Sequence, residues 1–266
     1  VGIAAGVEDM FSIPMGGFNP DFHPELAEQE YYIGMGETAE ILAKEGQISR
    51  DDQEQFSVES HQKALDAWAS GRFNNEVVPI DVYGEAMVKK DEGPREPNLE
   101  KIKSLNPAFL ENGTITPATS SPISIGAAAI LITSRNFAES KNLTTRATIR
   151  SRGIAGVDWR KMGIGPLPAT EKALNNGNLS MDNVDVIELN EAFAAQSLYV
   201  IRNGGWDPSK VNKNGGAIAL GHPLGCSGAR ILTTLINVME QQDANTGLAT
   251  MCIGTGQGIA TILERN

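Results

Sequence analysis

Hydrophobic residues along this chain fall into short runs typical of buried strands and into stretches with the helical period of 3.6 residues. In the second half the two kinds of segment alternate. Runs at 147–156, 184–189, 215–220, 247–254 and 258–264 predict strands, and 168–177, 190–203 and 227–241 predict helices. Strands that alternate with helices predict a layered α/β fold, in which ligands gather at the carboxyl ends of the strands.

The first half of the chain is less regular. It predicts a buried strand at 1–5, a helix at 35–44, a strand at 77–83 and a buried helix or strand at 126–133. Ser49 and Asp52 form the pattern of a capping box, so a second helix follows them, with an apolar stripe through Phe56, Ala64 and Trp68. Segments 10–30 and 84–98 are rich in proline, glycine or charge and predict loops.

Composition narrows the function classes. The chain has 266 residues and a formal net charge of −11, which argues against a nucleic-acid partner because phosphate binding needs a positive surface. It still permits an anionic small ligand held by a few cations or backbone amides. We find no apolar run long enough to span a bilayer. Two cysteines cannot form a disulfide framework and indicate a reducing, cytoplasm-like compartment.

Two scarce residues stand in conspicuous settings. His222 lies in a Gly-His-Pro turn between a predicted strand and a predicted helix, a setting that fixes where its ring points and favours a functional role. Cys252 ends an apolar strand before a glycine-rich turn, where backbone amides can approach a ligand. The alternative for Cys252 is a small buried hydrophobe. We interpret the other two histidines, His23 and His61, as structural.

Two further positions have open interpretations. Asn190 directly follows the predicted strand 184–189, so its amide can serve a site at the strand end or cap the next helix. Cys226 stands at the start of the predicted helix 227–241, where a thiolate is favoured, but close packing among the neighbouring glycines explains it better. With His222 and Cys252, Asn190 falls at or just past a predicted strand end.

Three stretches together carry a specific resemblance: NEAFAAQ at 190–196, NGGAIALGHPLGCSGAR at 214–230 and MCIGTGQGIA at 251–260. With them the chain resembles the thiolases, acyl-CoA acyltransferases. The weaker motifs AGVEDM, MGETAE, EGPR, GTITPATSSP and MGIGP follow in the thiolase order, so the resemblance covers the whole chain. It is closest to the 3-ketoacyl-CoA thiolases that form the β subunit of the bacterial fatty-acid β-oxidation complex.

The resemblance implies roles for three residues. In the family a nucleophilic cysteine takes the acyl group; His222 matches the histidine that activates it. Cys252 matches a second cysteine, the acid and base at the substrate's α-carbon. Asn190 matches an asparagine whose bound water, with the histidine, holds the thioester oxyanion. Thiols suit these steps because a thiolate is nucleophilic and a second thiol can move a proton at carbon.

The resemblance also implies substrate contacts. Met35, Met162 and Phe193 match residues that line the acyl end of the pocket, Ser121 matches a serine that bonds the pantetheine arm, and Phe109 packs near it. Core packing is the alternative for the apolar residues. Coenzyme A is a substrate here, and no cofactor or metal is implied. Arg95, in EGPR, is a possible contact for CoA phosphates, although a solvated loop cation fits it better.

The family fold is a layered αβαβα arrangement, and the resemblance implies that its amino-terminal half is truncated here. We expect residues 1–137 to be the remainder of that half, with a loop domain inserted at about 11–114, and 138–266 to be the carboxyl-terminal half. The family's nucleophile helix lies upstream of the strand that AGVEDM matches, and neither Cys226 nor Cys252 lies in its context. We therefore expect no thiolytic turnover from this chain alone. Ile125 and Thr255 depart from common family residues.

The expected activity is thiolytic cleavage of 3-ketoacyl-CoA by CoA. The alternatives are a non-catalytic acyl-CoA-binding remnant or partner subunit, and a biosynthetic acetoacetyl-CoA thiolase. Family members are homodimers or tetramers, and a hydratase–dehydrogenase α subunit is a possible partner. The resemblance implies a bacterial cytoplasm, or a mitochondrial or peroxisomal matrix in a eukaryote.

Overall fold

The computed structural model describes residues 1–13, 15–84 and 86–265. Its centre is a four-stranded sheet with the strand order β5-β8-β7-β6. β6 runs parallel to β7, and the other pairs are antiparallel. All four residues of β6 are buried, as expected for a strand covered on both faces. The strands are β5 (Thr148–Gly156), β6 (Val186–Leu189), β7 (Thr246–Ile253) and β8 (Gln257–Glu264).

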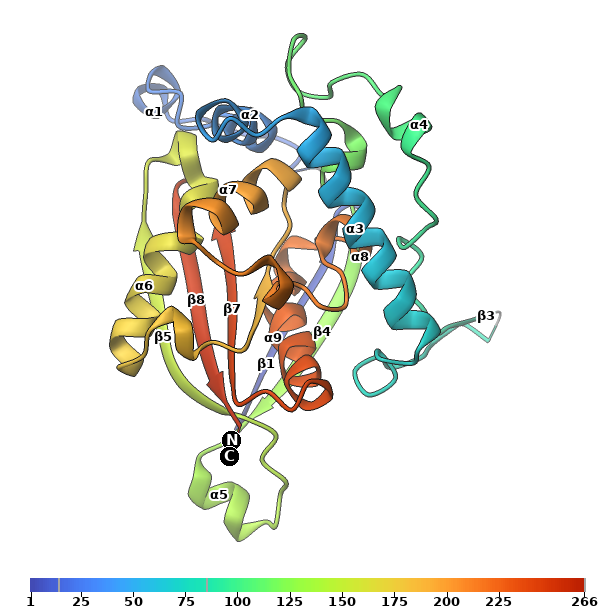
Figure 1. The fold of residues 1–266 in the computed structure, drawn as a ribbon, viewed down its shortest axis with the longest axis vertical. Helices are drawn as coiled ribbons and strands as arrows, with labels where there is room; N and C mark the ends of the chain where they lie inside the picture. The colour runs from blue at the N-terminus through green and yellow to red at the C-terminus, as the bar shows by residue number, and fades with distance from the viewer. Residues whose placement is uncertain (14, 85, 266) are drawn as a thin grey trace.

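Helices cover both faces of this sheet (Figure 1). On one face lie α6 (Pro166–Gly177) and α7 (Ala194–Gly204), which share an apolar core with the sheet. On the other face lies α9 (Leu224–Gln241), with a second core of its own. The far side of α9 packs against a two-stranded antiparallel sheet of β1 (Gly2–Asp9) and β4 (Ile125–Ile132). The layers are therefore sheet, helix, sheet, helix.

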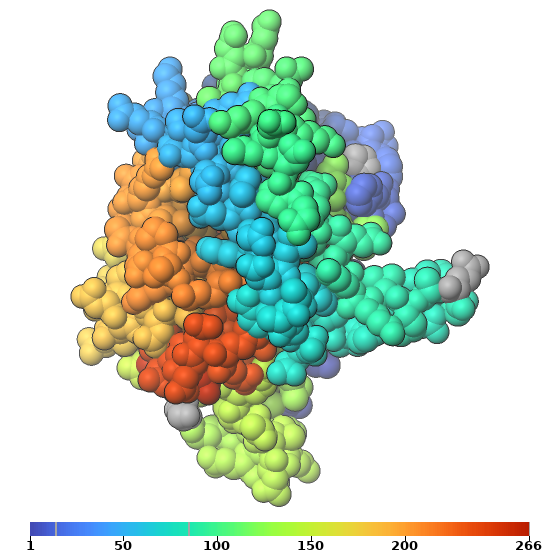
Figure 2. All heavy atoms as spheres, turned by 45° about the vertical axis from the view of Figure 1, so that its right-hand side comes forward, coloured from blue at the N-terminus to red at the C-terminus, as the bar shows by residue number. Residues whose placement is uncertain are grey.

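The segment between β1 and β4 holds α2 (Met35–Glu45) and α3 (Arg50–Ala69), which pack on α7. In Figure 1, α2 lies along the top and α3 runs from there down the right-hand side. The capping box at Ser49 is confirmed: its hydroxyl accepts from the Asp52 amide at 3.0 Å, and the Asp52 carboxylate accepts from the Ser49 amide at 3.1 Å. A hairpin of β2 and β3 projects from the body (Figure 2). The elements of this segment are α1 (Pro24–Glu28), α2 (Met35–Glu45), α3 (Arg50–Ala69), β2 (Ile80–Val82), β3 (Ala86–Val88), α4 (Leu99–Lys103) and η1 (Pro117–Thr119).

The remaining helices are short. They connect the main layers, and they are α5 (Arg135–Ser140), η2 (Trp159–Ile164), η3 (Met181–Asn183), η4 (Pro208–Lys210) and α8 (Ala217–Leu220).

Most elements predicted in the second half are confirmed to within a few residues. The strand predicted at 215–220 is wrong, because residues 217–220 form α8. The turn before it explains the difference. Gly215 has a φ of +80°, which favours glycine, and the Ile218 amide in the first turn of α8 donates to the buried Glu191 carboxylate at 3.2 Å. The helices predicted at 190–203 and 227–241 begin at 194 and 224 instead.

Predictions for the first half need more correction. Segments 1–5 and 126–133 are strands, but the prediction that they are buried is wrong, because Val1 and Ile3 in the first and Leu131 and Ile132 in the second are exposed. The strand predicted at 77–83 covers only 80–82, the loop 84–98 contains β3, and the loop 10–30 contains α1. Ala64 is buried, whereas Phe56 and Trp68 of the expected stripe are half-buried. Positions 14, 85 and 266 lie outside the described residues.

Candidate active site

Asn190 lies at the carboxyl end of β6 and is fully buried. Its backbone amide donates to the Thr250 carbonyl at 3.0 Å, which fixes it beside β7. The expectation that Asn190 caps a helix is wrong, because α7 begins at Ala194 and Phe193 stands at its N-cap. The Asn190 side chain is therefore free to serve the site. Its amide nitrogen lies 3.3 Å from His222 Nε2.

His222 lies between α8 and α9, so the expected strand before it is replaced by a helix. Gly221 before it has a φ of +97°, and the His222 amide donates to the Ser124 hydroxyl at 3.2 Å. Its Nδ1 lies 2.6 Å from the Ser227 hydroxyl. Burial, with a smaller contribution from the Arg230 cation, lowers the pKa of His222 to about 4. The imidazole is therefore neutral at neutral pH and can accept a proton.

Cys252 lies in β7, two residues after the Thr250 carbonyl that holds Asn190. Its side chain belongs to a buried apolar cluster, and burial raises its pKa to about 12. At neutral pH it is a thiol that can donate a proton. The structure thus places Asn190 and His222 in direct contact, and Cys252 on the adjoining strand at the same end of the sheet.

The five predicted substrate contacts gather around Cys252. Met162 and Phe193 belong to its apolar cluster, and Met35 packs against that cluster. The Phe109 ring meets Phe193 edge-on with a centroid distance of 5.7 Å. Ser121 adjoins them because its amide donates to the Ala192 carbonyl at 3.0 Å. These side chains form an apolar wall beside the thiol, which suits an acyl chain.

Sequence reasoning gave no role to two serines at this site, and a buried glutamate completes it. Ser227 touches the His222 ring, and Ser124 holds its backbone. Glu191 is buried and accepts hydrogen bonds from Ser60, Asn212 and Ile218. Glu191 directly follows Asn190 and Ser227 lies in the GCSGAR motif, so position was the available signal.

The structure also shows the surroundings of His61, a histidine outside the site. His61 is buried in α3, and its Nδ1 accepts from the Arg95 backbone amide at 3.4 Å. This supports its interpretation as structural. Arg95 itself is exposed.

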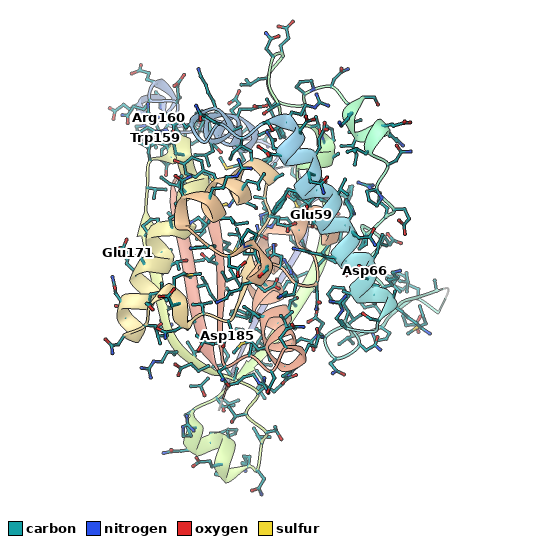
Figure 3. All side chains as sticks on the ribbon, in the orientation of Figure 1. Glu59, Asp66, Trp159, Arg160, Glu171 and Asp185 are labelled. Carbon is teal, nitrogen blue, oxygen red and sulfur yellow. The ribbon has the colours of Figure 1, made fainter. Side chains whose placement is uncertain are left out.

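Several acidic side chains lie on the outer surface of the chain. The exposed carboxylates Glu59, Asp66 and Glu171 stand on α3 and α6, outside the candidate site (Figure 3). Among the described residues, no helix combines the length and apolar character needed to cross a membrane. Within the same residues, His, Cys, Asp and Glu form no group of three or more that could hold a metal ion.

Comparison with known proteins identifies the family. The thiolase N-terminal domain matches residues 1–136, and the thiolase C-terminal domain matches residues 143–265. The chain belongs to the thiolase family. Thiolases are coenzyme A-dependent acyltransferases of fatty-acid metabolism.

Individual thiolases agree with this assignment. A 3-ketoacyl-CoA thiolase of Shewanella loihica is 52% identical over 99% of this chain and 70% of its own length, and one of Idiomarina loihiensis is 51% identical with the same coverage. The crystal structure of human mitochondrial 3-ketoacyl-CoA thiolase in complex with CoA matches with a TM-score of 0.91 at 36% identity, over 99% of this chain and 70% of that one. The fold is thus the thiolase-like α/β fold.

Proposed function

We propose that this thiolase-family chain serves the thiolytic cleavage of 3-ketoacyl-CoA by CoA in fatty-acid β-oxidation, which yields acetyl-CoA and a shortened acyl-CoA. The observation that carries the proposal is the contact of Asn190 with His222 at the sheet end where Cys252 meets an apolar wall. The names of its relatives, 3-ketoacyl-CoA thiolases, support the substrate class.

The proposed roles follow the proton and electron balance of this cleavage. The bond between the α-carbon and the β-carbonyl carbon breaks, and its electron pair stays on the α-carbon. Cys252, a thiol at neutral pH, donates its proton there and releases acetyl-CoA. The acyl group passes to a nucleophilic thiolate and then to the sulfur of CoA. His222 accepts the nucleophile's proton, and with a water held by Asn190 it stabilises the thioester oxyanion.

Neither cysteine of the 266 residues suits the nucleophile's part. Cys252 is assigned above. Cys226 is 2% exposed in the first turn of α9, and burial raises its pKa. A β-carbon added to Gly126 would lie 3.6 Å from the Cys226 sulfur, so this thiol fills the contact between α9 and β4. We propose that the 266-residue chain by itself binds acyl-CoA but does not turn it over.

The test separates binding from turnover. Calorimetric titration with a long-chain acyl-CoA is expected to show binding that Phe193→Ala weakens. The matched control is Phe18→Ala, which removes a ring that is 71% exposed in the loop after β1. Absence of acyl-CoA binding to the wild-type chain refutes the substrate class. Loss of 3-ketoacyl-CoA is then followed in the presence of CoA, and steady turnover refutes the proposed inactivity.

A second candidate function is a non-catalytic acyl-CoA-binding subunit. The buried, protonated state of Cys226, which does not suit nucleophilic attack, favours it. The rate of proton exchange at the α-carbon of bound acetyl-CoA in deuterated water, followed as the pH is raised, distinguishes the two, because removal of the α-proton requires the Cys252 thiolate. Exchange that Cys252→Ala abolishes supports the acid–base role, and binding without exchange supports the second candidate. The biosynthetic direction uses the same groups in reverse.

The organisation and partners of the chain are also proposals. We propose a remainder of an amino-terminal thiolase half at 1–137, with a loop domain inserted at about 11–114, and a carboxyl-terminal half at 138–266. The positions of the two domain matches support a division near 137. By analogy with the family we propose homodimers or tetramers, a hydratase–dehydrogenase α subunit as partner, and a cytoplasmic location in a bacterium.

A further inference from the structure

The environment of the His222 ring defines where its single proton lies. Ser227, in the first turn of α9, is 1% exposed, and its hydroxyl oxygen lies 2.6 Å from His222 Nδ1 and 3.0 Å from the Pro223 carbonyl oxygen. A carbonyl oxygen only accepts hydrogen bonds. The Ser227 hydroxyl therefore donates to Pro223, and its lone pair faces His222. For the short contact to be a hydrogen bond, Nδ1 must carry the proton.

The opposite edge of the ring gives the same answer independently. The Asn190 amide nitrogen lies 3.3 Å from His222 Nε2, and an amide nitrogen only donates. Nε2 must then accept and be unprotonated. Because burial keeps the imidazole neutral at neutral pH, there is one proton to place, and both contacts place it on Nδ1.

We propose that Ser227 is a positioning residue that holds His222 in the tautomer with the proton on Nδ1 and the lone pair of Nε2 facing Asn190. The catalytic meaning rests on the proposed function. Nε2 is then ready to accept the proton of a nucleophilic thiol, and once protonated the same atom can donate to the thioester oxygen. The other tautomer presents an N–H to the thiol and cannot accept its proton.

The backbone of His222 is held by groups other than the Ser227 side chain. Its amide donates to Ser124, and Gly221 and Pro223 fix the turn on either side. Removal of the Ser227 hydroxyl is thus expected to change the proton position more than the ring position. The ratio of the two His222 tautomers would not change if Ser227 had only a structural role, so it tests the positioning role.

The experiment is nitrogen-15 NMR of the free 266-residue chain, in which two-bond couplings from the ring carbon protons report each tautomer. The chain has three histidines, and His222→Gln identifies the signals of interest. In the wild type we expect Nδ1–H. Ser227→Ala is expected to lower the ratio of the Nδ1–H to the Nε2–H tautomer by about tenfold, as for the loss of one hydrogen bond. Ser227→Thr is expected to restore it.

Thr233→Ala is the matched control. The Thr233 hydroxyl makes the same kind of bond within α9, to the Ala229 carbonyl at 2.9 Å, and lies eleven residues from His222 along the chain. It is expected to leave the His222 signals unchanged. A wild-type chain with the proton on Nε2 overturns the proposal, and so do His222 signals that Ser227→Ala does not alter. If Ser227→Ala does not fold, the wild-type tautomer decides. No acyl-CoA is added, so the result is independent of substrate binding.

Discussion

Removal of the Glu191 carboxylate tests how the strand end that carries Asn190 is held to the elements around it. Glu191 is 2% exposed and follows Asn190 directly. Its oxygens accept from the Ser60 hydroxyl at 2.7 Å, the Asn212 side-chain amide at 2.8 Å and the Ile218 backbone amide at 3.2 Å. These donors come from α3, from the loop beside β6 and from α8, which leads to His222. Glu191→Ala therefore removes the acceptor that connects three elements.

The expected loss follows from the donors left without a partner. The Ser60 hydroxyl can rotate to another acceptor, but the Asn212 and Ile218 N–H groups are held by the fold. A buried donor without a partner costs about 1–3 kcal/mol, so Glu191→Ala is expected to reduce the free energy of unfolding by about 4 kcal/mol. Glu191→Gln retains the volume and one acceptor oxygen, and we expect roughly half of that loss.

Urea denaturation followed by tryptophan fluorescence measures this loss. Glu59→Ala is the control, because Glu59 stands exposed on α3 one residue before Ser60 (Figure 3). We expect it to change the free energy of unfolding by less than about 0.5 kcal/mol. If Glu191→Ala also stays within about 1 kcal/mol of the wild type, the carboxylate does not join these elements and the reasoning fails.

Two further changes probe the layers on either side of α9. A β-carbon at Gly6 would overlap a backbone oxygen of α9, whereas one at Gly2 meets nothing within 4 Å. Gly6→Ala is therefore expected to lower the unfolding midpoint in urea strongly, and Gly2→Ala is expected to change it little. Equal midpoints for the two variants would contradict the packing of β1 on α9. Burial raises the pKa of Glu188 to about 8, against an opposing contribution from Arg230. In the folded chain Glu188 therefore keeps a proton that it loses near pH 4.5 in the unfolded chain. The resulting contribution to the free energy of unfolding is fully present below pH 4.5 and is lost as the pH rises through about 8. The free energy of unfolding is expected to fall between about pH 5 and pH 9, and to fall less in Glu188→Gln; identical slopes in urea denaturation would refute this.

The sequence predicted the carboxyl-terminal half better than the amino-terminal half for a physical reason. Strands β6 and β7 are covered on both faces, so their apolar runs report burial directly. β1 and β4 have similar apolar composition, but one face of each is exposed. Composition alone cannot distinguish these two settings. The short apolar run of α8 is likewise compatible with a strand or a helix, and the hydrogen bond to Glu191 decides between them.

The candidate site shows the same limit. His222 and Cys252 could be predicted because scarce residues stood beside glycines, and Asn190 because it directly follows a predicted strand. Ser227 and Glu191 stand beside these positions, but their roles could not be predicted, because their hydrogen-bond partners come from distant parts of the chain or from a helical turn. A polar residue is recognised as buried and functional only when the group that satisfies it is known.

The two titratable groups of the site divide the proton transfers between them. His222, with a pKa lowered to about 4, and Cys252, with a pKa raised to about 12, are both uncharged at neutral pH. Moving a proton from a group of pKa about 12 to one of pKa about 4 costs about 11 kcal/mol. Cys252 therefore does not transfer its proton to His222. It gives up its proton only to a much stronger base, and the carbanion formed at the α-carbon of a thioester is such a base. The same burial that makes Cys252 a poor nucleophile thus makes it suited to end the cleavage by protonating carbon.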